Sequence, residues 1–272
     1  MTAFWYEQPR DVVRVSGVDA LTYLQSQISQ DIRNLGDGQS AYTFVLQPMG
    51  KVDALARVTR RSAEELIVDT DAGFGPALLA RLLRFKIRVK AEIEVSDGHC
   101  IAVRGAVDAP APAIAAWGRH DAFDLLGADA VPPRDVRAGT QAELQVARIE
   151  AGWPAMGAEI TDASIPAETG VVDLAVSFTK GCYPGQELVE RMDSRGSTAP
   201  RFVRRLRGTT SAAVGTQLVH DGKLVGAITS LAESAAGWVA LAIVARSVAP
   251  GETVELEHGQ AVVEESRPRE DA

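Results

Sequence analysis

The sequence predicts an α+β protein with a large mixed body followed by a small all-β domain, and three observations support this. The chain has 272 residues, 46% of them apolar, which exceeds the usual length of one domain and is enough for more than one core. Helical spacing and short β-rich runs alternate in its first two thirds, whereas only short β-rich runs follow Arg201. We therefore expect two domains, residues 1–198 and residues 199–272.

The body is expected to begin with a helix and a group of strands. Apolar residues that recur every three or four positions predict one amphipathic helix from Ser16 to about Gly36. Ser16 and Asp19 have the spacing of a capping box at its first turn. The β-branched and aromatic runs that follow predict three strands, at residues 41–46, 51–60 and 65–70.

A second helix is expected to open at Pro76, because a proline lacks the N–H donor that would have no partner at a first helical position. Its apolar face continues to about Ile87, and a strand at Val89–Val95 should follow. The proline- and glycine-rich stretch 106–133 predicts loops with one short helix at Ile114–Trp117.

Beyond this stretch, the residues from Gln141 to Gly152 predict a helix. Turn-forming residues then predict loops and short pieces over residues 155–178.

The C-terminal domain is predicted from its turns. Asp221-Gly222 and His258-Gly259 lie between alternating runs, and Asp-Gly favours a tight hairpin because both central positions need positive φ. Five or six such strands in a short span are typical of a small barrel or sandwich. The charged residues 264–272 are expected to be a frayed tail.

Charge and composition exclude several classes of function. A net charge of −8 argues against direct nucleic-acid binding, because neutralising phosphates needs a basic face. No apolar run approaches the length of a membrane span, and the first residues lack the pattern of a secretion signal. Two distant cysteines without CxxC spacing indicate a reducing compartment, so we expect a cytoplasmic protein. We also expect a monomer.

The sharpest local feature is the segment Lys180-Gly181-Cys182-Tyr183-Pro184-Gly185-Gln186-Glu187. Its glycines and proline predict a tight turn just ahead of a helix, and the helix N-terminus and Lys180 would both favour a thiolate. A cysteine is otherwise a small buried hydrophobe, which is what we expect of Cys100 in its apolar run. We therefore predict that Cys182 is the functional cysteine.

Other chemistries have weaker support. A single cysteine cannot hold an iron–sulfur cluster, which normally needs four ligands, so a cluster would be shared or passed on. The histidines have no zinc spacing, and we predict no metal site. A cysteine hydrolase would need His120 as its base, and nothing in the sequence places His120 beside Cys182.

Three segments together carry a family resemblance: KGCYPGQE at 180–187, IPAE at 165–168 and RIEAGWP at 148–154. They resemble the signature of the YgfZ family of folate-binding proteins, whose eukaryotic members assist iron–sulfur maturation. SGVDALTYLQSQISQDI, YTFVLQPMGKVDALARV and the C-terminal runs GKLVGAITS and WVALAIVAR also resemble that family, in the same order. The resemblance covers nearly the whole chain.

The resemblance implies the fold of the glycine-cleavage aminomethyltransferase, with a tetrahydrofolate-binding body and a C-terminal β-barrel. A pterin offers a donor edge to a carboxylate and a face to aromatic rings, and the glutamate tail of folate favours lysine or arginine. The residues this implies are Cys182 and Asp53 for chemistry, and Lys51, Glu168, Lys180, Tyr183 and Arg191 for folate binding.

Two departures from the transferases matter for activity. The segment Trp117–Asp121 stands where the transferases carry a GYTGE-like pterin contact, and Ala54 replaces the second acid of their hairpin. The resemblance thus implies an accessory protein, assisting iron–sulfur machinery or client proteins such as tRNA-modifying enzymes. The alternatives are a folate-dependent aminomethyl or one-carbon transferase or demethylase, and a folate-sensing regulator.

Overall fold

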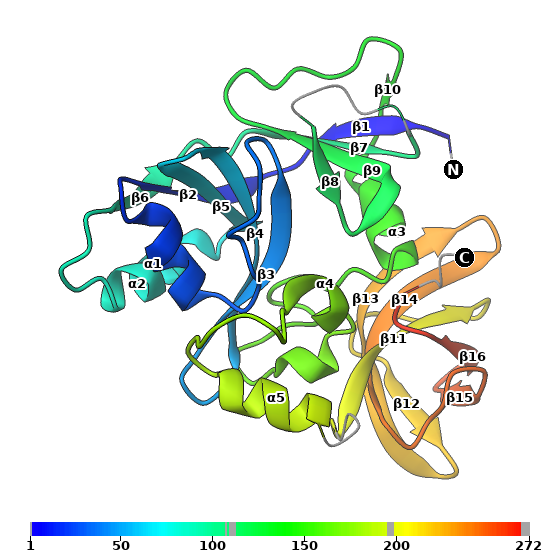
Figure 1. Cartoon of the computed structure of the whole chain (residues 1–272). Helices are drawn as coiled ribbons and strands as arrows, with labels where there is room; N and C mark the ends of the chain where they lie inside the picture. Colours follow the sequence, from blue (N-terminus) through cyan, green and yellow to red (C-terminus); the bar gives the residue numbers. More distant parts are fainter. Residues whose placement is uncertain (1, 107, 109–112, 195–198, 268–272) are drawn as a thin grey trace. The chain divides into compact units, whose positions relative to one another are not determined.

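The structure is a computed structural model of the whole chain, and it describes residues 2–106, 108, 113–194 and 199–267 (Figure 1). The chain forms two compact units: Met1–Gly139 with Asp173–Glu190, and Thr140–Val172 with Arg191–Ala272. The mixed helix and strand content and the closed C-terminal barrel confirm the predicted α+β class. The division of the chain at residue 199 stays a prediction.

The first unit contains a five-stranded antiparallel sheet in the order β3-β4-β5-β2-β6, here called the helix-covered sheet. It includes the three strands predicted from β-branched runs. Its strands are β2 (Arg10–Ser16), β3 (Ser40–Leu46), β4 (Val52–Ser62), β5 (Glu65–Asp71) and β6 (Glu92–Ser96).

Helices α1 (Ala20–Gln27) and α2 (Gly75–Arg84) lie on the same face of this sheet (Figure 1). Leu24 of α1 and Leu78 and Leu82 of α2 are fully buried against apolar strand residues. Burying such a side chain contributes about 2 kcal/mol each to folding. Helix α2 begins as predicted, with proline in its first turn, but ends three residues short of Ile87.

The predicted helix from Ser16 to Gly36 is wrong in length. Ser16 ends β2, and the N-cap Asp19 makes no side-chain capping bond; its carboxylate instead accepts from the Lys90 N–H at 2.8 Å. Ile28 is extended and bridges to Val45 of β3. The apolar spacing continues past Gln27 because Ile28 and Ile32, which lie beyond the helix, are buried like the apolar residues of the helix. Periodicity alone could therefore not find the end of the helix.

A second sheet in the first unit has the order β10-β1-β7-β9-β8. The short helix predicted at Ile114–Trp117 is wrong: this segment is a strand and a turn, paired with the strand that follows it. Short apolar runs do not distinguish helix from strand. The strands are β1 (Phe4–Glu7), β7 (Cys100–Arg104), β8 (Ile114–Ala116), β9 (Arg119–Leu126) and β10 (Arg137–Ala138).

The two sheets share an apolar cluster. Val12 and Ile67 of the helix-covered sheet pack with Cys100, Ile114 and Leu126 of the second sheet. Cys100 is fully buried, as predicted for a core cysteine, and burial raises the pKa of its thiol. The first unit is completed by most of α4 (Val172–Ala175) and the start of α5 (Gln186–Ser194).

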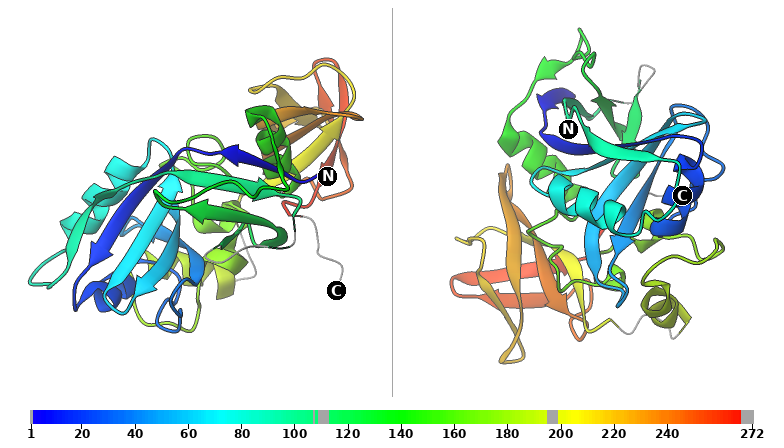
Figure 2. Two further views of the ribbon diagram at one scale, coloured as in Figure 1. Left: turned by 90° about the horizontal axis from the view of Figure 1, so that it is seen from above. Right: turned by 90° about the vertical axis from the view of Figure 1, so that its left-hand side faces the viewer.

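The second unit consists of helix α3 (Gln141–Glu150), the 3₁₀ turn η1 (Pro166–Glu168) and a closed six-stranded barrel, shown in two further views in Figure 2. A capping box between Thr140 and Glu143 starts α3. Asp221 and Gly222 both have positive φ, which confirms the predicted hairpin. The barrel strands are β11 (Arg201–Gly208), β12 (Gln217–His220), β13 (Lys223–Ser234), β14 (Gly237–Ala245), β15 (Thr253–Leu256) and β16 (Gly259–Glu264).

The tail predicted at residues 264–272 lies partly outside the described residues. Its first residues are held: the Ser266 hydroxyl donates to the Val203 carbonyl of β11. A Cβ on Gly152 would meet the Ser266 carbonyl oxygen at 1.6 Å, so the chain passes close to the end of α3 here. Residues 265–267 therefore belong to the packed part of the second unit.

Candidate functional site

Cys182 lies in an exposed turn directly before α5, and its thiol is free. The turn closes when the Gln186 N–H donates to the Tyr183 carbonyl at 3.3 Å, while the Gln186 side chain accepts from the Tyr183 N–H at 3.3 Å. The predicted order of turn and helix is confirmed. An exposed thiol ahead of a helix can reach a partner without any local unfolding.

Two glycine turns interlock beside this cysteine. Gly185 has φ +84°, and a Cβ there would lie 2.6 Å from the Gln47 carbonyl oxygen and 3.1 Å from the Gly50 Cα. Gly50 has φ +85°, and a Cβ there would lie 2.5 Å from the Leu188 Cβ. No larger residue fits such an approach without displacement of main chain. The β3–β4 turn, which carries Lys51, is thereby held against the Cys182 turn.

Lys180 fixes the same turn to another segment. Its ammonium donates to the main-chain carbonyls of Gln25 at 2.6 Å, Ile28 at 2.5 Å and Gln30 at 3.1 Å, and the residue is 7% exposed. Burial lowers the pKa of Lys180 to about 8. All three donors of the ammonium are used within the protein. The predicted role of Lys180 in binding a folate tail stays a prediction, and its contacts here are structural.

Tyr183 supports the turn from the inside. Its ring is buried, and the Lys180 ammonium lies 5.1 Å from the ring centroid. Burial, helped by the charge of Glu190, raises the pKa of Tyr183 to about 12. The tyrosine is therefore neutral, and its buried ring packs against the Lys180 ammonium at the start of the turn.

Asp53 is tied to an arginine that the sequence did not single out. The Arg81 Nε lies 3.4 Å from Asp53 Oδ2, and its Nη2 donates to the Leu46 carbonyl at 2.9 Å. Arg81 is 6% exposed, while a quarter of the Asp53 side chain remains exposed. The sequence could have indicated Arg81, because it is an arginine on the apolar face of α2. Asp53 thus presents a positioned, accessible carboxylate.

The last two predicted residues lie outside the first unit. Glu168 is buried, with Oε1 accepting from Arg201 Nε at 2.9 Å and Oε2 from the Ile165 N–H at 3.3 Å. Arg191 is exposed on α5, in the part of that helix assigned to the second unit. The first unit therefore contains Lys51, Asp53, Lys180, Cys182 and Tyr183. Glu168 belongs to the second unit and already has structural partners.

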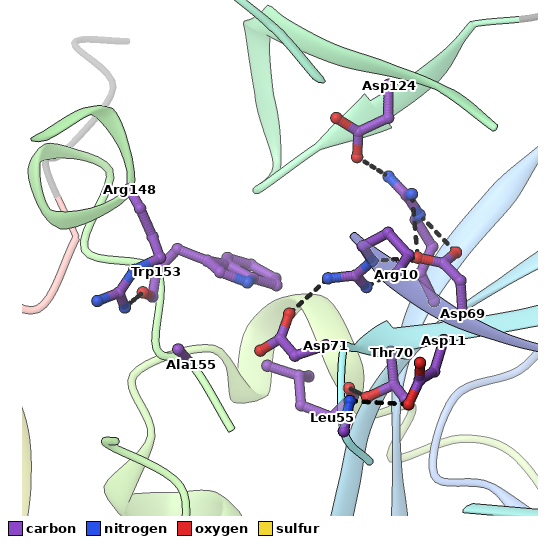
Figure 3. Close-up of polar contacts among 12 residues, drawn as sticks. Arg10, Asp11, Leu55, Asp69, Thr70, Asp71, Asp124, Arg148, Trp153 and Ala155 are labelled. Carbon is purple, nitrogen blue, oxygen red and sulfur yellow. Dashed lines mark hydrogen bonds and ion pairs between the residues drawn. The ribbon is translucent and has the colours of Figure 1, made fainter. Parts of the chain in front are cut away.

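The first unit also contains buried charges that the sequence analysis missed. Arg57, 1% exposed, pairs with Asp69 at 3.0 Å and with Asp124 at 2.7 Å, linking the two sheets. Arg10 lies between Asp69 and Asp71, as Figure 3 shows. The sequence could have indicated these buried charges through a charged residue inside an apolar strand, such as Arg57 in LARVT.

A second buried network lies within the second unit. Glu159 accepts from Arg148 Nη1 at 2.9 Å, from Ser230 at 2.6 Å and from Thr229 at 2.7 Å. Arg148 also donates to the Trp153 carbonyl at 2.7 Å, a contact drawn in Figure 3. The segment RIEAGWP is therefore pinned to the β13 strand of the barrel.

Over the described ranges, no group of three or more histidine, cysteine, aspartate or glutamate side chains is arranged to hold a metal ion. No helix in the same ranges is long and apolar enough to cross a membrane.

Comparison with known proteins defines the class. The glycine cleavage system aminomethyltransferase T of Bartonella henselae matches with a TM-score of 0.81 over 97% of this chain and 85% of that protein, at 19% sequence identity. No protein-family model matches the sequence. The chain has the aminomethyltransferase fold, which confirms the predicted architecture.

Sequence relatives show which proteins of this fold class the chain is similar to. The tRNA-modifying protein YgfZ of Enterobacter sp. (strain 638) is 29% identical over 67% of this chain and 65% of its own length. The mitochondrial iron–sulfur cluster assembly factor IBA57 homolog of Pyricularia oryzae is 29% identical over 71% of this chain and 54% of its own length. Relatives at 26–29% identity over most of this chain support its assignment to the YgfZ family. The chain spans between half and two thirds of the Enterobacter and Pyricularia relatives.

Proposed function

We propose that this protein binds tetrahydrofolate and supports the assembly or repair of iron–sulfur clusters, and through them cluster-dependent enzymes such as those that modify tRNA. The observation that carries the proposal is the exposed Cys182 thiol on a turn held by Lys180 and by the Gly50–Gly185 contact. The names of the relatives, a tRNA-modifying protein and an iron–sulfur assembly factor, support it.

In this proposal Cys182 is a transient ligand. Its thiol loses a proton to solvent as its sulfur binds iron, and it supplies one of the ligands that a cluster needs. The remaining ligands come from a partner of the iron–sulfur machinery or from a client protein. The fixed turn keeps the sulfur exposed, so a partner's thiolates can displace it and take the iron.

The residues of the first unit suit tetrahydrofolate in part. Asp53 offers an accessible carboxylate for the donor edge of a pterin, and the half-buried Lys51 offers a cation for a glutamate tail. Arg191 is an exposed cation of the second unit, and Glu168 of the same unit would have to give up Arg201 to serve a ligand. We therefore assign the folate contacts of the first unit to Asp53 and Lys51. Bound tetrahydrofolate would supply a one-carbon carrier or an ordering ligand.

Cys182→Ala separates the two parts of the proposal. We expect it to abolish rescue of cluster-dependent enzyme activities in cells that lack the protein, while calorimetric titration of tetrahydrofolate gives an unchanged Kd. Cys100→Ala is the matched control: it removes the buried cysteine and should retain rescue if the protein folds. Full rescue by Cys182→Ala, or intact enzyme activities in the deleted cells, would remove the maintenance function.

The same protein preparations distinguish the alternatives. Turnover of an aminomethyl or N-methyl donor with tetrahydrofolate would establish a transferase or demethylase. Folate binding combined with full activity of Cys182→Ala in cells would instead indicate a folate-sensing regulator. A cytoplasmic location and a monomeric state stay predictions, tested by fractionation and by light scattering.

A further inference from the structure

Six side chains in the first unit form a row of alternating charge, here called the charge row: Asp71, Arg10, Asp69, Arg57, Asp124 and Arg104. The successive contacts are 2.5, 2.8, 3.0, 2.7 and 2.9 Å long. Figure 3 shows the part around Arg10, Asp69, Asp71 and Asp124. The row crosses from the helix-covered sheet to the second sheet, where Asp124 and Arg104 lie on β9 and β7.

The two ends of the charge row differ. At one end, 27% of the Asp71 side chain is exposed, so water can solvate it. At the other end, Arg104 is 2% exposed. Its Nη1 donates to Asp124 Oδ1 at 2.9 Å, the Val103 carbonyl at 2.8 Å and the Phe123 carbonyl at 2.9 Å. Its Nε and Nη2 are buried and have no hydrogen-bond partner in the described part of the chain.

The unpartnered atoms of Arg104 have a specific geometry. Nε–H and one N–H of Nη2 point the same way in a guanidinium, and this edge matches the two oxygens of a carboxylate. A buried donor without an acceptor costs about 1–3 kcal/mol, more when it is charged, so such an edge is rare unless something uses it. Asp124 cannot use it, because that carboxylate already contacts Nη1 and Arg57.

Trp117 holds the guanidinium in place. The Arg104 Cζ lies 3.9 Å from the centroid of the indole ring. Trp117 itself has φ +56°, a conformation that costs a non-glycine residue about 1 kcal/mol or more. Its main-chain N–H donates to the Tyr42 hydroxyl at 2.8 Å. The chain therefore accepts backbone strain to keep an aromatic face under Arg104.

The charge row is neutral as a whole, but its well-buried part carries an excess positive charge. Its well-buried members are three arginines, Arg10, Arg57 and Arg104, and two aspartates, Asp69 and Asp124, which gives three minus two, or one excess positive charge. Asp71 balances this excess from the far end of the row. The alternation of sign would continue past Arg104 only if an anion bound there.

We propose that the Nε and Nη2 edge of Arg104 binds the carboxylate of a small organic acid, as the seventh member of the charge row. The carboxylate accepts one hydrogen bond from each nitrogen, and Trp117 fixes the plane in which it binds. None of these residues belongs to the Cys182 turn, and the site does not require that the protein binds folate. The carboxylate can come from a free acid such as glycine or acetate, or from the glutamate part of a folate.

Nitrogen-15 NMR of the wild-type protein tests the site directly, because it observes the Arg104 Nε–H without any substitution. We expect this resonance to shift on titration with acetate, glycine or p-aminobenzoylglutamate, and not with matched sodium chloride or a tetrahydropterin that lacks the tail. A shift with acetate or glycine identifies a free acid as the source, and a shift with p-aminobenzoylglutamate alone identifies the folate tail. An unchanged resonance with every carboxylate overturns the proposal.

Arg104→Lys gives an independent readout, since lysine keeps the charge but has no fork. It should weaken binding of the active carboxylate by about tenfold or more, as expected when a bidentate charged contact is lost. The matched control is Arg14→Lys, which alters a half-buried arginine that pairs with Glu94 in the same unit and should leave the affinity unchanged. Equal affinities of wild type and folded Arg104→Lys would overturn the assignment to this edge.

Discussion

Gly185→Ala and Gly181→Ala form a matched pair that tests how the Cys182 turn is held. At Gly185, a Cβ would lie 2.6 Å from the Gln47 carbonyl oxygen in a residue with φ +84°. The positive φ costs alanine about 1 kcal/mol, and overpacking against main chain adds about 1–3 kcal/mol. We therefore expect Gly185→Ala to lower the free energy of unfolding by about 3 kcal/mol.

Gly181→Ala should behave differently. A Cβ at Gly181 meets nothing within 4 Å, and its backbone does not have positive φ. Alanine there should raise the free energy of unfolding by a few tenths of a kcal/mol, through the lower entropy of the unfolded chain.

Urea unfolding measures the free energies of unfolding of Gly185→Ala and Gly181→Ala. The rate at which Cys182 reacts with a disulfide reagent reports the local state of the turn. Equal stabilities and equal thiol reactivities for the two variants would show that the interlocked turns do not hold the site.

Four further predictions concern buried charges. Lys180→Met should lower the free energy of unfolding by about 3 kcal/mol, against about 0.5 kcal/mol or less for the half-buried Lys51→Met; equal losses in urea unfolding would contradict this. Because burial lowers the pKa of Lys180 from 10.5 to about 8, the unfolded chain binds more protons between these pH values, and the stability of wild type relative to Lys180→Met should rise with pH across that window. Burial opposes the ionisation of Asp124, but the charges of Arg104 and Arg57 outweigh burial and lower the pKa of Asp124 from 3.8 to about 2. About 2 kcal/mol of the free energy of unfolding should therefore be lost as pH falls from about 4 to about 2. An Asp124→Asn variant measured by the same acid titration should lack this loss. Glu159→Gln should destabilise by about 3 kcal/mol in thermal unfolding, since Arg148 would lose its buried partner, and an unchanged Tm would refute that role.

Local signals made much of the fold predictable. The barrel hairpin at Asp221-Gly222 depends on residues adjacent in sequence, and so does the start of α3 at Thr140. The turn before α5 was predictable for the same reason, because glycine and proline surround Cys182. In contrast, Ile28 continues a helical pattern yet is extended, because its partner Val45 lies in a strand that the pattern cannot identify.

The site was predictable only where its residues are close in sequence. Gly50 and Gly185 each indicate a turn, but their contact joins segments far apart in the chain. Arg57 and Asp124 belong to different sheets, so nothing local pairs them. Glu168 was proposed from its place in a motif, and the structure gives it Arg201 as a partner from β11. Nonlocal pairing decides which charged residues remain available to a ligand.

Three main-chain oxygens converge on the Lys180 nitrogen, an arrangement that in other proteins dehydrates and holds a monovalent ion. Here the cation is covalently attached to the chain, two residues from Cys182. The order of this loop is therefore independent of the sodium or potassium content of the medium, and no change in salt composition can empty the cage while the lysine stays protonated.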